Sequence, residues 1–170
     1  MASRLTVRPY AGGDAAAVAA IYSQGIAERM ATFETEPRTA EDIREQFAAR
    51  MARYPAVVVE ADGSVVATAW TSEYRPRAAY ARIAEFSVYV ARDARGMGAG
   101  RLALSSLITA AEARGFLKLV SRVFPENIAS LRLCAALGFR EVGRYHRHGR
   151  LDGEWRDCVI VERLLGTARD

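Results

Sequence analysis

A glycine-rich segment between two apolar patterns constrains the fold of this 170-residue chain more than any other feature. It reads Arg95-Gly96-Met97-Gly98-Ala99-Gly100-Arg101. Residues 83–90 before it alternate like a strand, and apolar residues over 104–111 after it repeat at helical spacing. Glycine allows a positive φ and a close backbone approach, and the first N–H groups of a helix lack partners within it. The segment therefore predicts a strand–turn–helix unit that binds an anion such as a pyrophosphate.

The spacing of the glycines excludes two common nucleotide-binding motifs. The dinucleotide fingerprint needs G-x-G-x-x-G and an acidic residue about 20 positions further on, and neither is present. The Walker phosphate loop ends in Gly-Lys-Ser/Thr, which is also missing here. A turn without any ligand is the alternative interpretation, but three alternating glycines between two arginines favour a site.

Periodicity and turn residues elsewhere predict the order β-α-α-β-β-β-α-β-α-β-β. Strands are expected over 6–10, 56–61, 64–72, 83–90, 118–124, 139–146 and 155–164. The helices are expected to begin at Asp14, at Thr39 (with Asp42 as a capping box), at the glycine-rich segment and at Asn127. Asp62-Gly63 and Asp152-Gly153 predict hairpin turns. This order indicates an α/β (α+β) protein with a mixed, mostly antiparallel sheet flanked by helices, in one domain over residues 1–170.

The strand over 83–90 is expected to present two different faces, because side chains alternate along a strand. One face would carry Ile83, Glu85, Ser87 and Tyr89, and the other Ala84, Phe86, Val88 and Val90.

Charge and hydropathy exclude several partner classes. The net charge is +4, but the arginines are scattered among acidic residues, which favours a solvated surface and no nucleic-acid partner. No apolar stretch approaches the roughly 20 residues that a membrane-spanning helix needs, so no membrane partner is expected. The N-terminal residues lack the apolar core of a signal peptide. We therefore expect a cytoplasmic protein.

The cysteines and histidines predict neither a disulfide framework nor a metal site. Cys134 and Cys158 form no C-x-x-C pair, and two cysteines fit a reducing compartment. His146 and His148 are expected on one strand face, but no third ligand has a suitable spacing, so no metal is expected.

The glycine-rich segment resembles the acetyl-CoA-binding motif of the GNAT superfamily of N-acetyltransferases, Arg/Gln-x-x-Gly-x-Gly/Ala. Further blocks are similar, in the family's order, to phosphinothricin N-acetyltransferases and the related methionine sulfoximine/sulfone acetyltransferases. These blocks are Ala31-Thr32-Phe33-Glu34-Thr35-Glu36-Pro37, Arg77-Ala78-Ala79-Tyr80, Glu85-Phe86-Ser87-Val88-Tyr89-Val90, Asn127-Ile128-Ala129-Ser130-Leu131 and Gly153-Glu154-Trp155-Arg156-Asp157. The glycine motif is specific only to the superfamily, whereas the Thr-Phe-Glu-Thr-Glu-Pro and Ser-Val-Tyr-Val blocks are more specific.

The resemblance implies a GNAT acyl-CoA N-acyltransferase fold, in which the parallel strands over 83–90 and 118–124 splay apart. It implies acetyl-CoA as the cosubstrate, a small-molecule amine as the acceptor, direct transfer through a ternary complex, and a homodimer. The cofactor-binding residues that it implies are Val88, Tyr89, Val90, Arg95, Gly96, Met97, Gly98, Ala99, Gly100, Arg101 and Asn127.

The resemblance also implies a set of substrate-binding residues, namely Phe33, Thr35, Glu36, Arg75, Pro76, Arg77, Tyr80, Glu85, Phe86 and Ser87. Guanidinium groups suit carboxylate, phosphinate or sulfone oxygens, which supports the two arginines. Solvated loop arginines are the alternative for these two, and a core aromatic that anchors its loop is the alternative for Phe33.

Amide formation from a thioester needs a base, because the α-ammonium group must lose a proton before it attacks. Glu85 is our candidate, acting directly or through water, and an edge-strand glutamate paired with Arg82 or Arg77 is the alternative. The backbone N–H of Val88 is the candidate donor to the developing oxyanion.

No general acid is assigned, because a thiol with an ordinary pKa near 8.5 leaves without help. Cys134 stands where the family often has histidine. We interpret it as a small buried apolar residue, with a nucleophile as the alternative.

The leading hypothesis is an N-acetyltransferase that acts on phosphinothricin, methionine sulfoximine or methionine sulfone. A protein or peptide N-terminal acetyltransferase would need an open groove in place of the loop over 32–37. A noncatalytic acyl-CoA-binding regulatory module would bind acetyl-CoA without turnover and would leave Glu85 idle.

Overall fold

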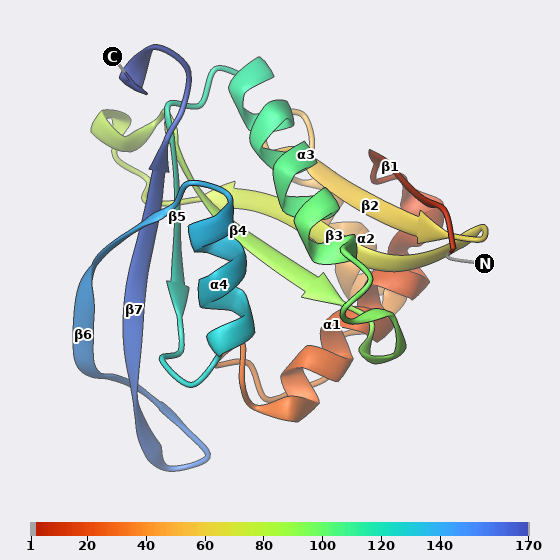
Figure 1. Ribbon diagram of the computed structural model, residues 1–170, viewed down its shortest axis with the longest axis horizontal. Coiled ribbons are helices and arrows are strands. Elements are labelled where there is room, and N and C mark those ends of the chain that lie inside the picture. Colours follow the sequence, from red (N-terminus) through yellow and green to blue (C-terminus); the bar gives the residue numbers. More distant parts are fainter. Residues whose placement is uncertain (1–2, 170) are drawn as a thin grey trace.

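A computed structural model describes residues 3–169 of the chain, so the first two residues of the N-terminal segment lie outside it. It shows one seven-stranded sheet in the order β1-β2-β3-β4-β5-β7-β6 (Figure 1). The strands are β1 (Leu5–Pro9), β2 (Ala56–Ala61), β3 (Ser64–Glu73), β4 (Ile83–Val90), β5 (Lys118–Val123), β6 (Arg140–Leu151) and β7 (Glu154–Leu164). The helices are α1 (Ala15–Glu28), α2 (Ala40–Ala48), α3 (Ala99–Ala113) and α4 (Ile128–Ala136). Neighbouring strands are antiparallel except β4 and β5, which confirms the expected order and the mixed sheet.

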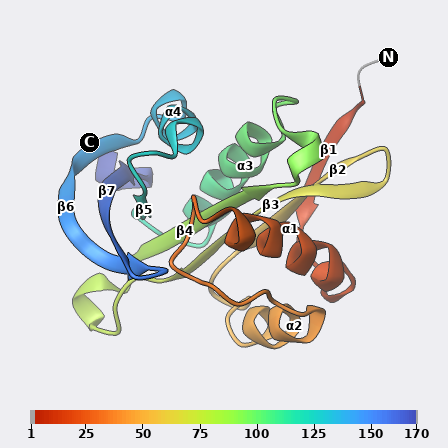
Figure 2. The same cartoon turned by 90° about the horizontal axis from the view of Figure 1, so that it is seen from below.

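The helices cover the two faces of the sheet unequally. Helices α3 and α4 lie on one face, and α1 and α2 lie on the other, below β2, β3 and β4 (Figure 2). The expected apolar face of α3 is buried, including Leu104 and Leu107. Ala84 and Phe86 join the core on the α3 side and Tyr89 joins the core on the α1 side, which confirms the two expected faces of β4. Among residues 3–169, no helix packs below β5, β7 and β6, so that part of the sheet stays open (Figure 2).

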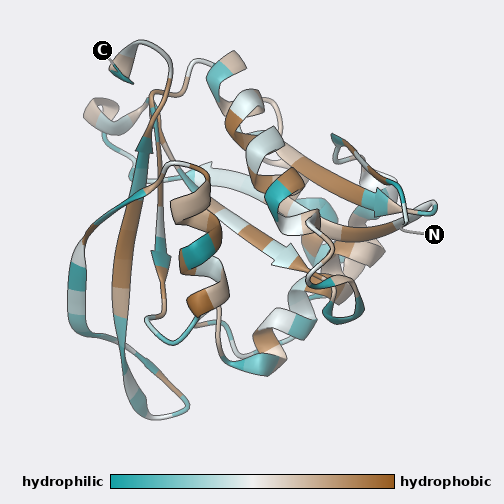
Figure 3. Cartoon of the chain, in the orientation of Figure 1, coloured by the Kyte–Doolittle hydropathy of each residue, from teal (hydrophilic) through white to brown (hydrophobic). Residues whose placement is uncertain are grey.

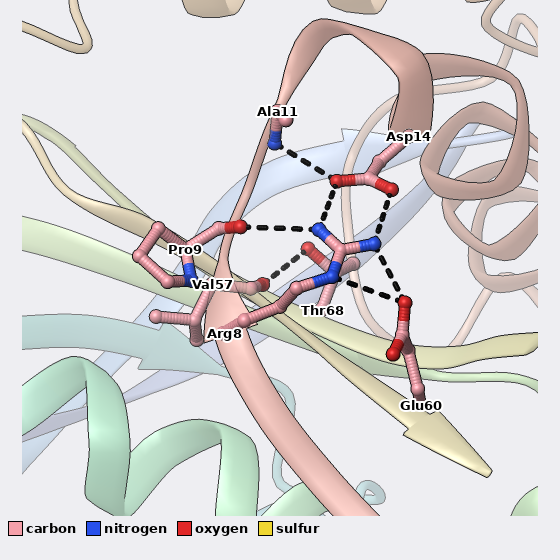
Figure 4. A network of polar contacts seen from close by, with 7 residues as sticks. All are labelled: Arg8, Pro9, Ala11, Asp14, Val57, Glu60 and Thr68. Atoms are coloured by element: carbon pink, nitrogen blue, oxygen red, sulfur yellow. Dashed lines mark hydrogen bonds and ion pairs between the residues drawn. The ribbon is translucent and has the colours of Figure 1, made fainter. Parts of the chain in front are cut away.

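Two of the expected helix caps are confirmed, and at the third, Asp14, the helix begins as expected but the cap bond is absent. Thr39 and Asp42 form the capping box of α2, and the Asn127 side chain accepts a hydrogen bond from the Ser130 N–H at the start of α4. Asp14 precedes α1, but its carboxylate makes no cap bond there. It instead accepts hydrogen bonds from Arg8 and from the Ala11 N–H, which hold the end of β1 against the start of α1 (Figure 4).

Arg8 connects this turn to the sheet. Its guanidinium binds Asp14 at 2.8 Å and Glu60 of β2 at 2.6 Å, while Thr68 of β3 donates to the Val57 carbonyl nearby (Figure 4). The hydrogen bonds from Arg8 are the main cause that lowers the pKa of Asp14. A carboxylate with a lowered pKa stabilises the fold at pH values above its unfolded pKa, and this contribution is lost as the pH falls through the folded pKa.

Replacing Arg8 with leucine is therefore expected to lower the free energy of unfolding by about 1.5–3 kcal/mol near neutral pH, as for hydrogen bonds to charged groups. The difference from the wild type should shrink on acidification, because protonated Asp14 no longer needs a cation. Urea unfolding at neutral and acid pH measures both effects. Arg44→Leu, which breaks an exposed ion pair with Glu41, is the control with little expected change. Equal losses for the two variants would contradict the prediction.

The last hairpin departs from the expected strand ends. The sequence pattern ended this strand at His146, but β6 continues to Leu151. The pattern failed because β6 is an exposed edge strand, hydrophilic along most of its length (Figure 3), with an irregularity between Tyr145 and Gly149. Arg147 takes a positive φ of 48° within it. Within residues 3–169, no helix is long and apolar enough to cross a membrane.

Candidate functional site

Strands β4 and β5 pair over three residue positions and then separate. The pairs run from Ile83–Lys118 to Glu85–Val120. At the next position the Ser121 hydroxyl donates a 3.0 Å hydrogen bond to the Phe86 carbonyl oxygen. This side-chain bond satisfies the carbonyl at the point where backbone pairing stops. The splayed pair of parallel strands that the family resemblance implied is therefore confirmed.

The backbone of β4 turns its polar groups into this gap. Along a strand, alternate residues direct their N–H and C=O groups to the same side. The Phe86 carbonyl points toward β5, whereas the Ala91 N–H points toward β3, where it donates to Val66. The N–H groups of Val88 and Val90 therefore also point toward β5, beyond the last β4–β5 pair. They are donors that a molecule in the gap can reach.

Three adjoining cavities surround the gap. The splay cavity, about 180 Å³, lies between the separated strands and is lined by Phe33, Glu85, Phe86, Ser87, Val88, Ser121, Arg122, Asn127 and Cys134, among others. The glycine groove, about 620 Å³, runs between α1, the glycine-rich turn and α4. The sheet-face cavity, about 670 Å³, lies on the open part of the sheet and is lined by Tyr74, Arg75, Tyr80, Glu85, Val120, Arg122, Tyr145 and His148, among others.

The glycine groove brings together the predicted cosubstrate residues. It is lined by Val88, Tyr89, Val90, Arg95, Gly96, Gly98, Ala99, Gly100, Arg101 and Asn127. Met97 does not line it, and 41% of its surface is exposed. Gly96 and Gly98 have φ values of 80° and 87°, which other residues rarely adopt. A Cβ at Gly100 would lie 3.1 Å from a Val90 methyl group, so glycine allows α3 to begin close against β4.

Glu28 of α1 holds both arginines of the turn before α3. It accepts hydrogen bonds from Arg95 at 2.9 and 3.0 Å and from Arg92 at 3.1 Å. Burial by itself raises the pKa of Glu28, but these hydrogen bonds together bring the pKa below its usual value. Arg95 already has a carboxylate partner, so the donors left for an anion in the groove include the backbone N–H groups at the start of α3 and the Arg101 side chain, which lines the groove.

Glu85 lies at the last position of the β4–β5 pairing, with 30% of its side chain exposed. Its ion-pair partner is Arg122 of β5, with Nη2 3.5 Å from Oε1. The alternative pairing with Arg82 or Arg77 is not observed, since the Arg82 guanidinium donates to the Gly115 carbonyl. Burial raises the pKa of Glu85, and the charges of Arg122 and Arg75 oppose that rise only in part. Such a carboxylate is a stronger base than an exposed one.

The three cavities meet at a small number of residues. The splay cavity shares Val88, Tyr89 and Asn127 with the glycine groove, among others. It shares Glu85, Ser121 and Arg122 with the sheet-face cavity. The three cavities therefore adjoin in the order glycine groove, splay cavity and sheet-face cavity.

The predicted substrate-binding residues are divided between two cavities. Phe33, Glu85, Phe86 and Ser87 line the splay cavity, and Arg75, Tyr80 and Glu85 line the sheet-face cavity. Thr35, Glu36, Pro76 and Arg77 line none of the three cavities. The two sets meet at Glu85.

Phe33 serves the core as well as the cavity. Its ring lies edge-on to Phe124 with centroids 5.0 Å apart. It also approaches Gly149 so closely that a Cβ there would lie 2.7 Å from the ring. These contacts support both interpretations of Phe33. It belongs to a loop that covers a cavity, and its ring anchors that loop to the core.

Several lining residues carry no motif and were missed from the sequence. They are Tyr22, Ser121, Arg122 and Cys158 of the splay cavity and Glu28 of the glycine groove. For Ser121 and Arg122 a signal exists in retrospect, because two polar residues interrupt an apolar strand beside the predicted gap.

Cys134 is 2% exposed and lines the splay cavity. Burial raises the pKa of its thiol to about 11, which disfavours the thiolate form. This supports the interpretation as a small buried residue over that as a nucleophile. Within the described part of the chain, no three histidine, cysteine or acidic side chains gather as a metal-ligand set.

Known proteins resemble the chain over nearly its whole length. The sequence profile of the acetyltransferase (GNAT) family matches residues 22–139. A phosphinothricin N-acetyltransferase of Alcaligenes faecalis is 38% identical, over 95% of this chain and 83% of that protein. An L-methionine sulfoximine/L-methionine sulfone acetyltransferase of Pseudomonas paraeruginosa is 30% identical, over 96% of each chain. The structure of a phosphinothricin acetyltransferase from Sinorhizobium meliloti in complex with acetyl-CoA superposes with a TM-score of 0.90 and 30% identity, over 98% of this chain and 90% of that one.

Proposed function

The chain belongs to the acetyltransferase (GNAT) family and uses acetyl-CoA, and from this premise we propose that it acetylates the α-amine of a small amino acid. The acceptors would be of the phosphinothricin, methionine sulfoximine or methionine sulfone type, as the names of its relatives suggest. The observation that carries the proposal is the place of Glu85. It lies in the wall shared by the splay cavity and the sheet-face cavity, and the splay cavity in turn adjoins the glycine groove.

The glycine groove suits the anionic and extended parts of acetyl-CoA. The N–H groups at the start of α3 would bind the pyrophosphate, and the backbone of Val88 and Val90 would pair with the pantetheine arm. The acetyl group would then lie in the splay cavity, with its carbonyl oxygen toward the Val88 N–H. A fixed donor at this position stabilises the negative charge that develops on that oxygen during transfer.

Glu85 would accept the proton of the acceptor's ammonium group, directly or through water. Its raised pKa makes it a better match to this task than an exposed carboxylate, and it still ionises beside Arg122. The free amine would attack the acetyl carbon in the splay cavity, and the CoA thiolate would leave. No side chain is assigned as an acid for this thiolate, since Cys134 holds its own proton tightly.

The test is the release of CoA, followed by a thiol reagent, with acetyl-CoA and a panel of amines. The panel holds methionine sulfone, methionine sulfoximine, phosphinothricin, plain amino acids and a peptide with a free N-terminus. Turnover confined to the small amino acids supports the proposal. Turnover only on the peptide would replace it with protein acetylation, and acetyl-CoA binding without any turnover would favour a regulatory module.

Ser121 is expected to act as a positioning residue, because its hydroxyl holds β4 where pairing with β5 ends. Ser121→Ala should lower the free energy of unfolding by about 0.5–1.5 kcal/mol and lower kcat by about 10-fold. The KM for acetyl-CoA should change little. Ser105→Ala, which removes a hydroxyl that donates to the Leu102 carbonyl within α3, is the control for kcat. A loss of stability with unchanged kcat would show that Ser121 only supports the fold.

Three further properties stay predictions. All strands of the described residues join one sheet, which supports a single domain over residues 1–170. The resemblance to the family supports a homodimer and a cytoplasmic location.

A further inference from the structure

Arg122 lies where the acceptor's reacting end would have to be. It stands on β5, two residues beyond Val120, the last residue of β5 that pairs with β4. It lines both the splay cavity and the sheet-face cavity, as Glu85 and Ser121 do. The family motifs described above do not include it. Its guanidinium is therefore a cation in the shared wall to which the site described so far gives no contact with the acceptor.

The contact between Arg122 and Glu85 is loose. Their closest nitrogen and oxygen atoms are 3.5 Å apart, longer than a normal hydrogen bond, and 50% of the Arg122 side chain is exposed. A half-exposed ion pair at this distance stabilises a fold only weakly. Either group can therefore exchange its partner for a ligand of the same charge without a large loss of stability.

The spacing of the pair matches the charged end of an α-amino acid. Three bonds separate the ammonium nitrogen from a carboxylate oxygen, so these atoms lie roughly 3 Å apart. A carboxylate partner for the ammonium group and a guanidinium partner for the carboxylate must therefore be close neighbours. Glu85 and Arg122 have these two charges and are close neighbours. Arg75 also acts on Glu85, but it follows β3 in a loop and its guanidinium lies over the Tyr74 ring.

From this arrangement we infer that Arg122 binds the α-carboxylate of the acceptor while Glu85 binds its ammonium group. The zwitterion inserts between the two side chains and replaces their loose contact with two complementary ones. The pair thereby selects α-amino acids over simple amines, and Arg75 and Tyr80 remain for the oxygens of the acceptor's side chain. This inference rests on the proposed function and adds a specificity-determining residue to it.

The experiment compares two acceptors that differ only in the carboxylate: L-methionine sulfone and 3-(methylsulfonyl)propan-1-amine. Steady-state kinetics are measured for the wild type, Arg122→Leu, Arg122→Lys and Arg132→Leu. Arg132 is an exposed arginine of α4 that lines none of the three cavities, so it is the matched control. Arg122→Leu should raise the KM for methionine sulfone about 10- to 100-fold, as expected for a lost bond between charged groups. The KM for 3-(methylsulfonyl)propan-1-amine should change little, because this amine has no carboxylate. Arg122→Lys should recover part of the loss, and Arg132→Leu should behave as the wild type.

The outcomes separate this inference from the proposed function. Equal losses for both acceptors in Arg122→Leu would overturn the inference, because Arg122 would then act through Glu85 or the fold. A wild type that prefers the amine would overturn the inference and leave acetyl transfer intact. A wild type that acetylates neither acceptor nor any other amino acid of the panel would overturn the proposed function, and the inference with it. Melting temperatures of the variants identify any that fail to fold.

Discussion

Replacing Glu85 with glutamine is expected to lower kcat for an amino-acid acceptor by about 10²- to 10⁴-fold, the usual contribution of a general base. Glutamine keeps the size of the side chain but accepts no proton. The dissociation constant for acetyl-CoA, measured by calorimetry, should stay nearly unchanged, because Glu85 does not line the glycine groove. Glu73→Gln, at the end of β3 and outside all three cavities, is the control.

The pH dependence sharpens this test. Burial raises the pKa of Glu85, so the wild-type kcat should rise with pH through that raised pKa as the carboxylate ionises. The loss in Glu85→Gln should be largest between this pKa and that of the acceptor's ammonium group. It should shrink at higher pH, where the amine is already free and needs no base. A parallel loss of acetyl-CoA affinity would instead give Glu85 a structural role.

Replacing Gly98 with valine is expected to weaken acetyl-CoA binding by about 100-fold or more, as for the loss of two hydrogen bonds to a charged group. Gly98 has a φ of 87° at the position before α3, and a β-branched residue there must change the backbone. The N–H groups at the start of α3 would then no longer point together into the glycine groove. Calorimetric titration with acetyl-CoA measures the effect.

Gly63→Val is the matched control for Gly98→Val. Gly63 has a φ of 82° in the turn between β2 and β3, and a Cβ at either glycine meets nothing within 4 Å. Both substitutions therefore introduce a similar backbone strain, but Gly63 lies far along the chain from the groove residues and lines none of the three cavities. The control should lose stability and keep its affinity for acetyl-CoA. A similar loss of affinity in both variants would mean that strain alone, and not the turn, explains the result.

The order of the elements was predictable because local chemistry sets it. Thr39 with Asp42, Asn127 and the Asp62-Gly63 turn specify where elements begin and reverse, and each acts within a few residues. Asp14 shows the limit of this reasoning. Its helix is correctly placed, but its carboxylate goes to Arg8 of β1, a partner that only the tertiary structure brings close. The same holds for β6, whose pairing with the apolar β7 overrides its own hydrophilic pattern.

The candidate site was predictable where a motif carries it and not elsewhere. The glycine-rich turn was placed correctly, since its conformation needs glycine at Gly96 and Gly98. The roles of Ser121 and Arg122 depend on the residue at which β4 and β5 stop pairing, and no periodicity in the sequence encodes that residue. Arg75 lines the sheet-face cavity and Arg77 does not. This difference depends on the path of the loop that carries both residues, which the sequence pattern does not encode either.

The shared wall between the splay and sheet-face cavities has a stereochemical consequence. An amino acid whose ammonium group meets Glu85 and whose carboxylate meets Arg122 has two of its four substituents fixed. In this binding mode the lone pair of the amine nitrogen must face the splay cavity, where the acetyl group lies. The side chain must enter the sheet-face cavity toward Arg75 and Tyr80. The mirror-image molecule, held by the same two groups, turns its side chain away from that cavity. A site that holds the ammonium group, the carboxylate and the side chain in this way is expected to acetylate one enantiomer of an acceptor faster than the other.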